Sequence, residues 1–299
     1  MVNALSVDVE ESFHASEIQS VIGLGRGLQL PSRIEGQTRR VLELLESRNA
    51  RATFFILGWV AEQVPALLRE IVRAGHEIGC HSYAHKLVYT LTPAEFEADT
   101  RRAVSAIEDA CGIRATIYRA PSYSITAQSL WALEILVQCG FTHDSSIYPI
   151  SHDRYGIPGF GRFAQNLTTP SGSIYEIPIA TAQLSATMVA PVGGGGYLRL
   201  LPYRYTAAGI RRINNIDQQP ACIYFHPWEL DPDQPRFPCG ALARIRTYSG
   251  LRGMSAKLAQ LLSDFRFSSL MAVHDRPIAE DVIEQPTSRS RSTMPLIHW

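Results

Sequence analysis

The chain has 299 residues, of which 45% are hydrophobic and 19% are charged, a balance typical of a globular protein with a large core. Lys plus Arg and Asp plus Glu both number 28, so no basic charge favours binding to nucleic acid or to an anionic membrane surface. No uncharged apolar run reaches roughly 18 residues, and the sequence therefore predicts no transmembrane segment.

The cysteines and the first residues predict where the protein works. The five cysteines are odd in number and scattered through the chain, at positions 80, 111, 139, 222 and 239. This pattern indicates buried, reduced thiols and not a disulfide framework. The first residues have no basic segment and reach Asp8 too early for a signal peptide. We therefore expect a cytoplasmic protein.

The first half of the chain alternates between predicted strands and helices. Apolar residues at helical spacing, often followed by glycine, predict helices over 35–48, 60–74, 92–111 and 126–139. Short β-rich runs predict strands over 4–10, 52–57, 76–80, 116–119 and 141–144.

The second half is less regular. A stretch rich in Pro, Gly and Ser predicts a long functional loop over 149–172, and the glycines at 193–196 predict a flexible hinge. Further strands are expected over 175–178, 221–226 and 267–273, and helices over 203–216 and 241–264. The predicted boundaries are a domain over 1–275, with an extension from about 236, and a flexible tail over 276–299.

The predicted strands are short apolar runs without polar alternation, and helices separate them. This combination indicates an α/β protein whose parallel sheet is buried on both faces. The first strand is not followed by Gly-x-Gly-x-x-Gly, and no Walker sequence is present, so a nucleotide-binding sheet is disfavoured. A closed or partly open barrel is the fold that the pattern favours.

The pair His81 and His85 is the first candidate site. Positions four apart lie on one face of a helical turn, so both imidazoles could reach one metal ion. Imidazole is a good ligand for zinc and for similar divalent ions.

Ionisable residues follow one predicted strand after another. In (β/α) barrels, catalytic side chains converge where the parallel strands end. Two histidines and a carboxylate can hold a divalent ion with an open position, while a second carboxylate and a third histidine serve as base and acid. These residue types together indicate metal-assisted hydrolysis; the strand-end residues are Asp8, Glu10, His81, His85, Arg119, Asp144 and His226.

Five motifs occur in the order found in the polysaccharide deacetylases (NodB-homology domain, carbohydrate esterase family four), and the chain resembles that family. The motifs are Ser-Val-Asp-Val-Glu, His-Ser-Tyr-Ala-His, Tyr-Arg-Ala-Pro-Ser-Tyr, His-Asp-Ser-Ser and Tyr-Phe-His-Pro-Trp-Glu, between residues 4 and 229. Segments at 193–202, 225–231 and 247–251 resemble one branch more closely, the exopolysaccharide deacetylases that accompany exosortase (PEP-CTERM) systems. The family implies a distorted (β/α)7 barrel, here with a C-terminal helical extension.

The resemblance also implies a metal site. The metal ligands are Glu10, His81 and His85, where Glu10 departs from the usual aspartate, and Glu11 is an alternative ligand. The implied metal is zinc, with cobalt, nickel or manganese as alternatives.

Catalytic and substrate-binding roles follow from the same motifs. Asp8 matches the general base, Arg119 the arginine that pairs with it, His226 the catalytic acid, and Asp144 the acid that orients this histidine. Substrate-binding positions are Ser122, whose backbone N–H faces the oxyanion, and Tyr123 and Trp228, which would contact the sugar.

The implied reaction removes N-acetyl groups from amino sugars of the N-acetylglucosamine type, in a polysaccharide or in its lipid-linked precursor. A deformylase or amidase acting on a small or non-polymeric amide is an alternative, and an inactive carbohydrate-binding protein is a further one. An open groove would favour a polymer, whereas a pocket roofed by residues 149–172 would favour a small substrate.

Overall fold

The computed structural model describes residues 1–23, 29–185 and 188–274, and its main sheet is organised around strand β1 (Val2–Val9). On one edge β1 pairs in parallel with β2 (Thr53–Ile56). On the other it pairs in parallel with β10 (Cys222–Phe225) and, nearer its start, with β11 (Arg266–Ser268). Segments from both ends of the described chain therefore meet at β1.

The strand order in the main sheet is β10-β1-β2-β3-β4-β5-β7-β6. All neighbours on this path are parallel except β6 and β7, which form an antiparallel hairpin. Strands β8 and β9 form a separate hairpin. The bounds are β3 Glu77–Cys80, β4 Ile117–Tyr118, β5 His143–Asp144, β6 Gln165–Thr169, β7 Gly172–Glu176, β8 Thr181–Gln183 and β9 Val189–Pro191.

The chain beyond β7 returns to the opposite edge of the sheet. The N–H of Ala180 donates to the carbonyl of Cys222 in β10 over 3.0 Å, so the sheet curls round on itself. This is the distorted α/β barrel that the sequence predicts.

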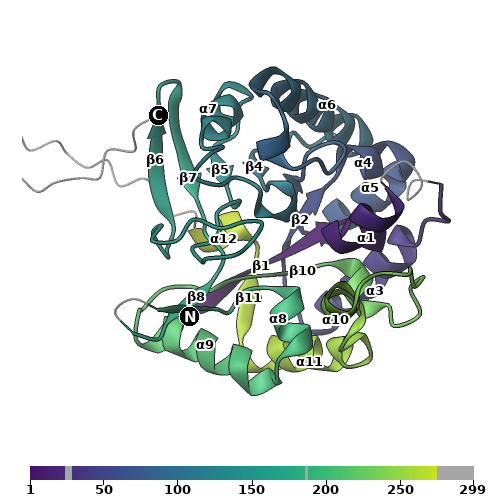
Figure 1. Cartoon of the computed structure of the whole chain (residues 1–299), viewed down its shortest axis with the longest axis vertical. Helices are drawn as coiled ribbons and strands as arrows, with labels where there is room; N and C mark the ends of the chain where they lie inside the picture. The colour runs from purple at the N-terminus through teal and green to yellow at the C-terminus, as the bar shows by residue number, and fades with distance from the viewer. Residues whose placement is uncertain (24–28, 186–187, 275–299) are drawn as a thin grey trace, which may run out of the picture.

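Helices surround the strands (Figure 1), with α4 to α7 on one side and α8 to α11 on the other. The α-helices are α1 Ser16–Ile22, α3 Ile34–Ser47, α4 Gly58–Gln63, α5 Pro65–Arg73, α6 Pro93–Cys111, α7 Trp131–Gln138, α8 Gly195–Leu200, α9 Tyr203–Asn215, α10 Ala241–Tyr248, α11 Leu251–Asp264 and α12 Leu270–His274. Short 3-10 turns are η1 Ser12–His14, η2 Val88–Thr90, η3 Pro121–Tyr123 and η4 Pro227–Leu230.

Three expected helices differ from those in the structure. The helix expected over 60–74 is two helices, because Pro65 cannot donate a helical hydrogen bond and begins α5. The helix expected over 241–264 breaks at Gly250, which has a left-handed φ of 79°. The helix expected over 126–139 begins only at Trp131.

Three other segments also differ from expectation. The last part of the loop predicted over 149–172 is strand β6 with the start of β7. The glycines predicted to form a hinge at 193–196 lead into helix α8. The strand predicted over 267–273 is β11 followed by α12.

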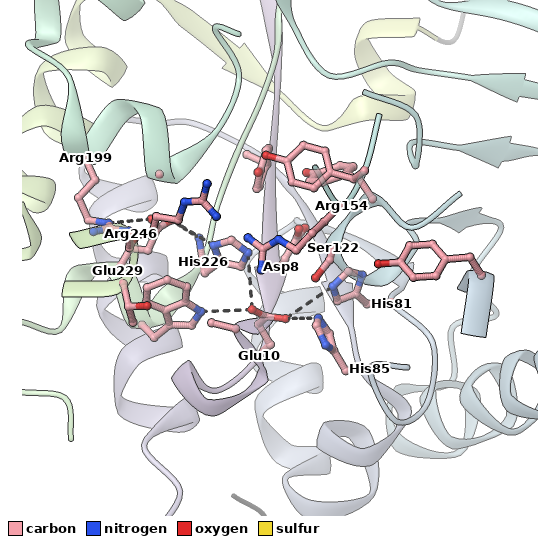
Figure 2. Close-up of a pocket in the computed structure, with 18 residues that line it drawn as sticks. Asp8, Glu10, His81, His85, Ser122, Arg154, Arg199, His226, Glu229 and Arg246 are labelled. Carbon is pink, nitrogen blue, oxygen red and sulfur yellow. Dashed lines mark hydrogen bonds and ion pairs between the residues drawn. The ribbon is translucent and has the colours of Figure 1, made fainter. Parts of the chain in front are cut away.

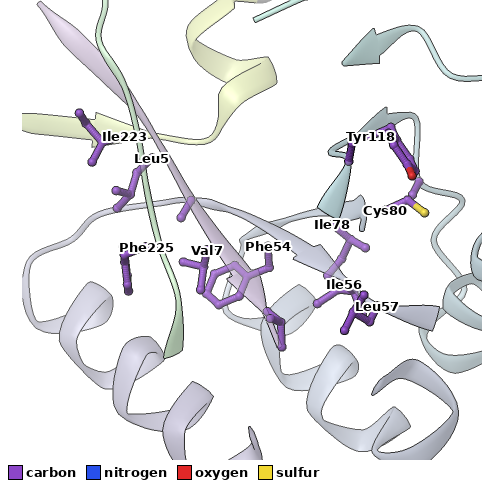
Figure 3. Close-up of a cluster of buried hydrophobic side chains, with 14 of the residues drawn as sticks. Leu5, Val7, Phe54, Ile56, Leu57, Ile78, Cys80, Tyr118, Ile223 and Phe225 are labelled. Carbon is purple, nitrogen blue, oxygen red and sulfur yellow. The ribbon is translucent and has the colours of Figure 1, made fainter. Parts of the chain in front are cut away.

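The two faces of the strands have different neighbours. Leu5 and Val7 of β1 belong to the main hydrophobic core between sheet and helices, together with Phe54 and Ile223 from the flanking strands (Figure 3). The alternate residue of β1, Asp8, points instead into the barrel, where it meets buried polar groups at the sheet's carboxyl end.

None of the helices in residues 1–23, 29–185 and 188–274 has the length and apolar character needed to cross a membrane. The five cysteines are free, and Cys80, Cys139 and Cys222 are buried as the sequence predicts, whereas Cys111 and Cys239 are partly exposed. The tail predicted over 276–299 lies outside the described residues.

Candidate active site

A buried ion pair, Asp8 with Arg119, lies at the carboxyl end of the barrel strands. Nη1 of Arg119 donates to Oδ1 of Asp8 over 2.7 Å and to Oγ of Ser6 over 2.6 Å, and the arginine is fully buried. Its Nε and Nη2 donate to the carbonyl and the hydroxyl of Ser145. With these contacts and the Phe55 ring beneath it at 4.1 Å, Arg119 is held in one orientation.

Next to this pair, Glu10 meets the two predicted metal histidines. Its Oε2 lies 2.6 Å from Nε2 of His85 and 3.8 Å from Nε2 of His81, and all three side chains are buried. Burial alone would raise the pKa of Glu10, but His85, His226 and His81 outweigh it and hold this pKa well below its usual value. Glu10 is therefore ionised.

The histidines come together on a loop and not on the expected helical turn. His81 directly follows β3, and the next residues form bends with Ser82 at a φ of 66° and His85 at a φ of 54°. Such left-handed conformations are costly for residues other than glycine and recur at functional sites. Tight bends, and not a regular helix, bring the two rings to one carboxylate.

The three side chains suit a divalent metal ion. One ligand atom from each of Glu10, His81 and His85 lies within 4.8 Å of the others. Nδ1 of His81 is hydrogen-bonded to the carbonyl of Arg119 at 2.8 Å, which leaves Nε2 facing the cluster. Two neutral imidazoles and a carboxylate are a donor set used by catalytic zinc, so the residues fit the ion.

Glu11, the alternative ligand, has another function. Its Oε1 accepts hydrogen bonds from Oγ of Ser32 and from the backbone N–H groups of Arg33 and Ile34, at the start of helix α3. The structure thus brings Glu10, and not Glu11, to the histidines.

His226 lies on the other side of Glu10, directly after β10. Its Nε2 is 3.6 Å from Oε1 of Glu10, and its Nδ1 contacts Oε2 of Glu229 at 3.1 Å. Glu229 is itself held by Nε of Arg199 at 3.1 Å. Burial would lower the pKa of His226, but Glu10, Glu229 and Asp8 raise it to about 9.

The acid beside His226 is therefore Glu229, whereas the sequence assigned this position to Asp144. Asp144 accepts a hydrogen bond from Oγ of Ser146 and lies against Glu176 of β7, inside the sheet. The sequence analysis assigned no role to Glu229, although this residue lies three positions after His226. Glu229 accepts a hydrogen bond from the backbone N–H of His226 and so closes the turn that begins at Pro227.

The three predicted substrate-binding residues all line the same pocket (Figure 2). Ser122 and Tyr123 have positive φ values of 50° and 54°, which indicates a special backbone conformation where an N–H was expected to bind the oxyanion. Trp228 is only 4% exposed, stacks on His226 with ring centroids 5.0 Å apart, and donates from Nε1 to Glu10. Trp228 therefore packs against His226 and Glu10 and offers little surface to a sugar.

The pocket is wider than the set of predicted residues. Its wall also includes Arg154, Tyr155, Arg199 and Arg246, all from the second half of the chain. Arg154 and Tyr155 come from the loop that the sequence predicts as a possible roof over 149–172, whereas Arg199 and Arg246 follow no predicted strand and were not predicted as site residues.

The protein is thus an α/β barrel with a pocket at the carboxyl ends of its strands. In this pocket, Glu10, His81 and His85 form a set of ligands suited to a metal ion, and Asp8 and His226 lie beside them. Residues 30–143 match the family model described as polysaccharide deacetylase, and residues 145–275 match one described as a domain of unknown function (DUF3473). Residues 30–143 are thus similar to polysaccharide deacetylases.

Individual relatives agree with this result. The chain is 31% identical over 98 residues to the peptidoglycan-N-acetylglucosamine deacetylase of Bacillus cereus, a match covering 32% of this chain and 36% of that protein. It is 32% identical over 108 residues to the peptidoglycan deacetylase of Helicobacter pylori, a match covering 36% of each. The matches span less than half the length of these relatives.

The whole fold has a counterpart among solved structures. A structure described as a putative polysaccharide deacetylase from Mycobacterium smegmatis has a TM-score of 0.61 and 18% sequence identity, covering 97% of this chain and 94% of the other. This likeness confirms the barrel fold that the sequence predicts.

Proposed function

We propose that the protein is a metal-dependent hydrolase that removes N-acetyl groups from amino sugars of the N-acetylglucosamine type, in a polysaccharide or its lipid-linked precursor. One observation carries the proposal. Asp8, held by Arg119, and His226, held by Glu229, both lie beside the donor set of Glu10, His81 and His85. Amide hydrolysis needs this combination of a base, an acid and an electrophile. Relatives named as peptidoglycan deacetylases support the choice of substrate.

Each residue has a step in the proposed reaction. Asp8, paired with Arg119, takes a proton from the attacking water. His226, oriented through Nδ1 by Glu229, donates a proton from Nε2 to the leaving nitrogen, and the backbone N–H of Ser122 stabilises the oxyanion. Glu10, His81 and His85 would hold a divalent ion, zinc or alternatively cobalt, nickel or manganese, and this ion would supply Lewis-acid polarisation of the carbonyl and of water.

We also propose that residues 1–275 act as one catalytic unit. His226 lies in the segment that matches the domain of unknown function, whereas His81 lies in the deacetylase segment, and both line one pocket. The resemblance of residues 225–231 and 247–251 supports the exosortase-associated branch. The five free thiols support a reducing compartment, in agreement with a cytoplasmic location.

A deformylase or amidase with a small substrate is a second candidate, and one observation favours it. Arg154 and Tyr155, from the predicted roof at 149–172, form part of the pocket wall. An inactive carbohydrate-binding protein has less support, because sugar binding alone requires neither a fixed base nor a fixed acid.

The decisive experiment measures acetate release from N-acetylglucosamine and its oligomers of increasing length. We expect release that rises with chain length, is abolished by a chelator, and is restored by added zinc. Activity confined to the monosaccharide or to formamides would favour the second candidate. No hydrolysis of any amide after metal loading would contradict the proposal.

His81→Ala tests the proposed metal site directly. We expect loss of zinc binding, measured by titration calorimetry, together with loss of acetate release, since one of three ligands is removed. His143→Ala, which alters a histidine on β5 outside the donor set, is the matched control and should bind zinc as the wild type does. Unchanged zinc affinity in His81→Ala would contradict the site.

A further inference from the structure

The two histidines of the proposed metal site are held in different ways. Nδ1 of His81 is hydrogen-bonded to the carbonyl of Arg119 at 2.8 Å, so an atom outside the donor set fixes the direction of its ring. Nδ1 of His85 is buried and has no hydrogen-bond partner in the part of the chain that the structure describes. Since Nε2 of His85 faces Glu10 (Figure 2), ring packing has to fix the direction of this imidazole.

His14 packs against His85 from outside the donor set. The centroids of the two rings lie 5.3 Å apart, and their planes are tilted by 45°. His14 is only 1% exposed, and its ring also meets the edge of Trp59 in helix α4 at 5.8 Å. His85 contacts the ring of His81 as well, but His81 is itself a proposed ligand. His14 thus adds a contact that does not depend on the metal ligands themselves.

A hydrogen bond fixes the ring of His14. The backbone N–H of Glu11 donates to Nδ1 of His14 over 3.1 Å, within the turn η1. A ring nitrogen that accepts a hydrogen bond carries no proton, so His14 is neutral and has its proton on Nε2. The carboxylate of Glu11 accepts from the backbone N–H groups of Arg33 and Ile34. The turn that carries His14 is therefore anchored to the start of helix α3.

This turn connects the two segments that form the metal site. Glu10 precedes the turn by one residue, whereas His85 comes from the loop after β3. The φ of His85 is 54°, a left-handed value that costs free energy for a residue other than glycine. Contacts with neighbouring side chains must offset this cost, and the buried ring of His14 provides one of them.

We propose that His14 is a positioning residue of the metal site, whose ring holds His85 in the orientation in which Nε2 faces Glu10. This inference rests on the proposed metal-dependent hydrolase and assigns a role to a residue outside its ligands, base and acid. Side chains that hold a metal ligand from outside the coordination sphere typically contribute about 10- to 100-fold to metal affinity or activity.

His76 offers a matched control, because it precedes β3 at the opposite end of the strand from His81. It is also buried, its Nδ1 accepts a hydrogen bond from the backbone N–H of Ala52, and its ring packs on Phe54 with centroids 4.9 Å apart. Alanine at position 14 or 76 removes the same kinds of contact, so the two losses of stability should be similar. Of the two histidines, His14 is the one whose ring contacts a proposed metal ligand.

Titration calorimetry with zinc measures the expected difference. His14→Ala should weaken zinc binding by about 10- to 100-fold, whereas His76→Ala should leave the affinity unchanged. Urea unfolding of both variants shows whether their stabilities fall equally. The visible absorption spectrum of the cobalt-loaded protein, which reports the arrangement of ligands around the ion, should change in His14→Ala and not in His76→Ala.

Two further variants separate the ring from the hydrogen bond at position 14. His14→Phe keeps an aromatic ring against His85 but loses the acceptor for the Glu11 N–H, whereas His14→Asn keeps an acceptor and loses the ring. We expect zinc affinity close to that of the wild type in His14→Phe and reduced affinity in His14→Asn. The reverse ranking, or wild-type affinity in both His14→Ala and His14→Asn, would overturn the inference.

The same measurements distinguish this inference from the proposed function. Zinc binding that is lost in His81→Ala but unchanged in His14→Ala would support the metal site and overturn only the positioning role. Weaker zinc binding in His14→Ala, without amide hydrolysis by the wild type, would support the positioning role and contradict the hydrolase. Absence of zinc binding by the wild-type protein would contradict the metal site and this inference with it.

Discussion

Two buried carboxylates, Asp8 and Glu229, each face a buried arginine and each border the proposed reaction centre. Asp8 lies 2.7 Å from Arg119, and Glu229 lies 3.1 Å from Arg199. Removal of one partner from such a pair leaves an uncompensated buried charge, so both carboxylates affect stability as well as chemistry. Variants at these positions therefore require folding and activity to be measured separately.

Asp8→Asn tests the assigned base. The amide keeps the shape and an acceptor for Arg119 but cannot take a proton, so we expect kcat to fall by about 100- to 10,000-fold while zinc binding remains. Stability should fall by on the order of 1–3 kcal/mol, read by urea unfolding, because Arg119 loses its counter-charge. The exposed Asp109→Asn serves as control. Normal acetate release by Asp8→Asn would remove the assigned base.

The pair Glu229→Gln and Asp144→Asn decides which acid orients His226. We expect Glu229→Gln to lower kcat by roughly 10- to 100-fold with a smaller effect on KM, because Nδ1 of His226 loses a charged partner. Asp144→Asn should change kcat only slightly, since Asp144 contacts Ser146 and Glu176. The opposite ranking of the two variants would restore the role that the sequence assigned to Asp144.

At the scale of elements, the glycines at the start of α8 let this helix approach Glu229, the partner of His226. A Cβ on Gly195 would lie 1.8 Å from Oε2 of Glu229, whereas a Cβ on Gly196 would meet no atom within 4 Å. Glycine at 195 is thus required by close packing and not by hinge motion. The run also leads into α8, which carries Arg199.

Gly195→Ala is therefore expected to displace Glu229 and to lower kcat, with a loss of stability of about 1–3 kcal/mol from overpacking. Gly196→Ala places the same methyl group one residue further along α8, where no atom lies within 4 Å, so it should keep the wild-type melting temperature. Acetate release and thermal unfolding of the two variants give the comparison. Equal behaviour of both variants would show that the close approach at Gly195 has no effect on the site.

At the scale of the whole molecule, the carboxyls of Asp144 and Glu176 meet between β5 and β7, inside the sheet. Burial raises the pKa of both groups, and the neighbouring Asp144 raises that of Glu176 further, well above its usual value. The native state therefore keeps protons that the unfolded chain releases near a pH of about 4.5. Stability from this pair is fully present below that pH and is lost as pH rises toward the native pKa.

Glu176→Gln should remove this dependence, because the amide cannot ionise. We expect the variant's melting temperature to exceed that of the wild type increasingly as pH rises from 4 to 9, the range over which both should be measured. The difference between the two proteins isolates this pair from the other titrating groups. Parallel curves over that range would contradict the protonated pair.

The sequence by itself determined that strands and helices alternate, and it determined which ionisable residues follow the strands. Short apolar strands can be buried only between helices, and parallel strands end on one side of a barrel. For this reason Asp8, Arg119 and His226 could be placed near His81 before any geometry was known. Their residue types also restricted the chemistry to proton transfer beside a divalent ion.

Only the tertiary structure decided which side chain pairs with which. The choice of Glu10 over Glu11 and of Glu229 over Asp144 depends on which way each carboxylate points, and that direction is set by packing against distant segments. Arg154, Arg199 and Arg246 follow no strand and repeat no pattern, so only folding brings them to the pocket. Local sequence determines secondary structure and reactive groups, whereas long-range contacts determine their partners.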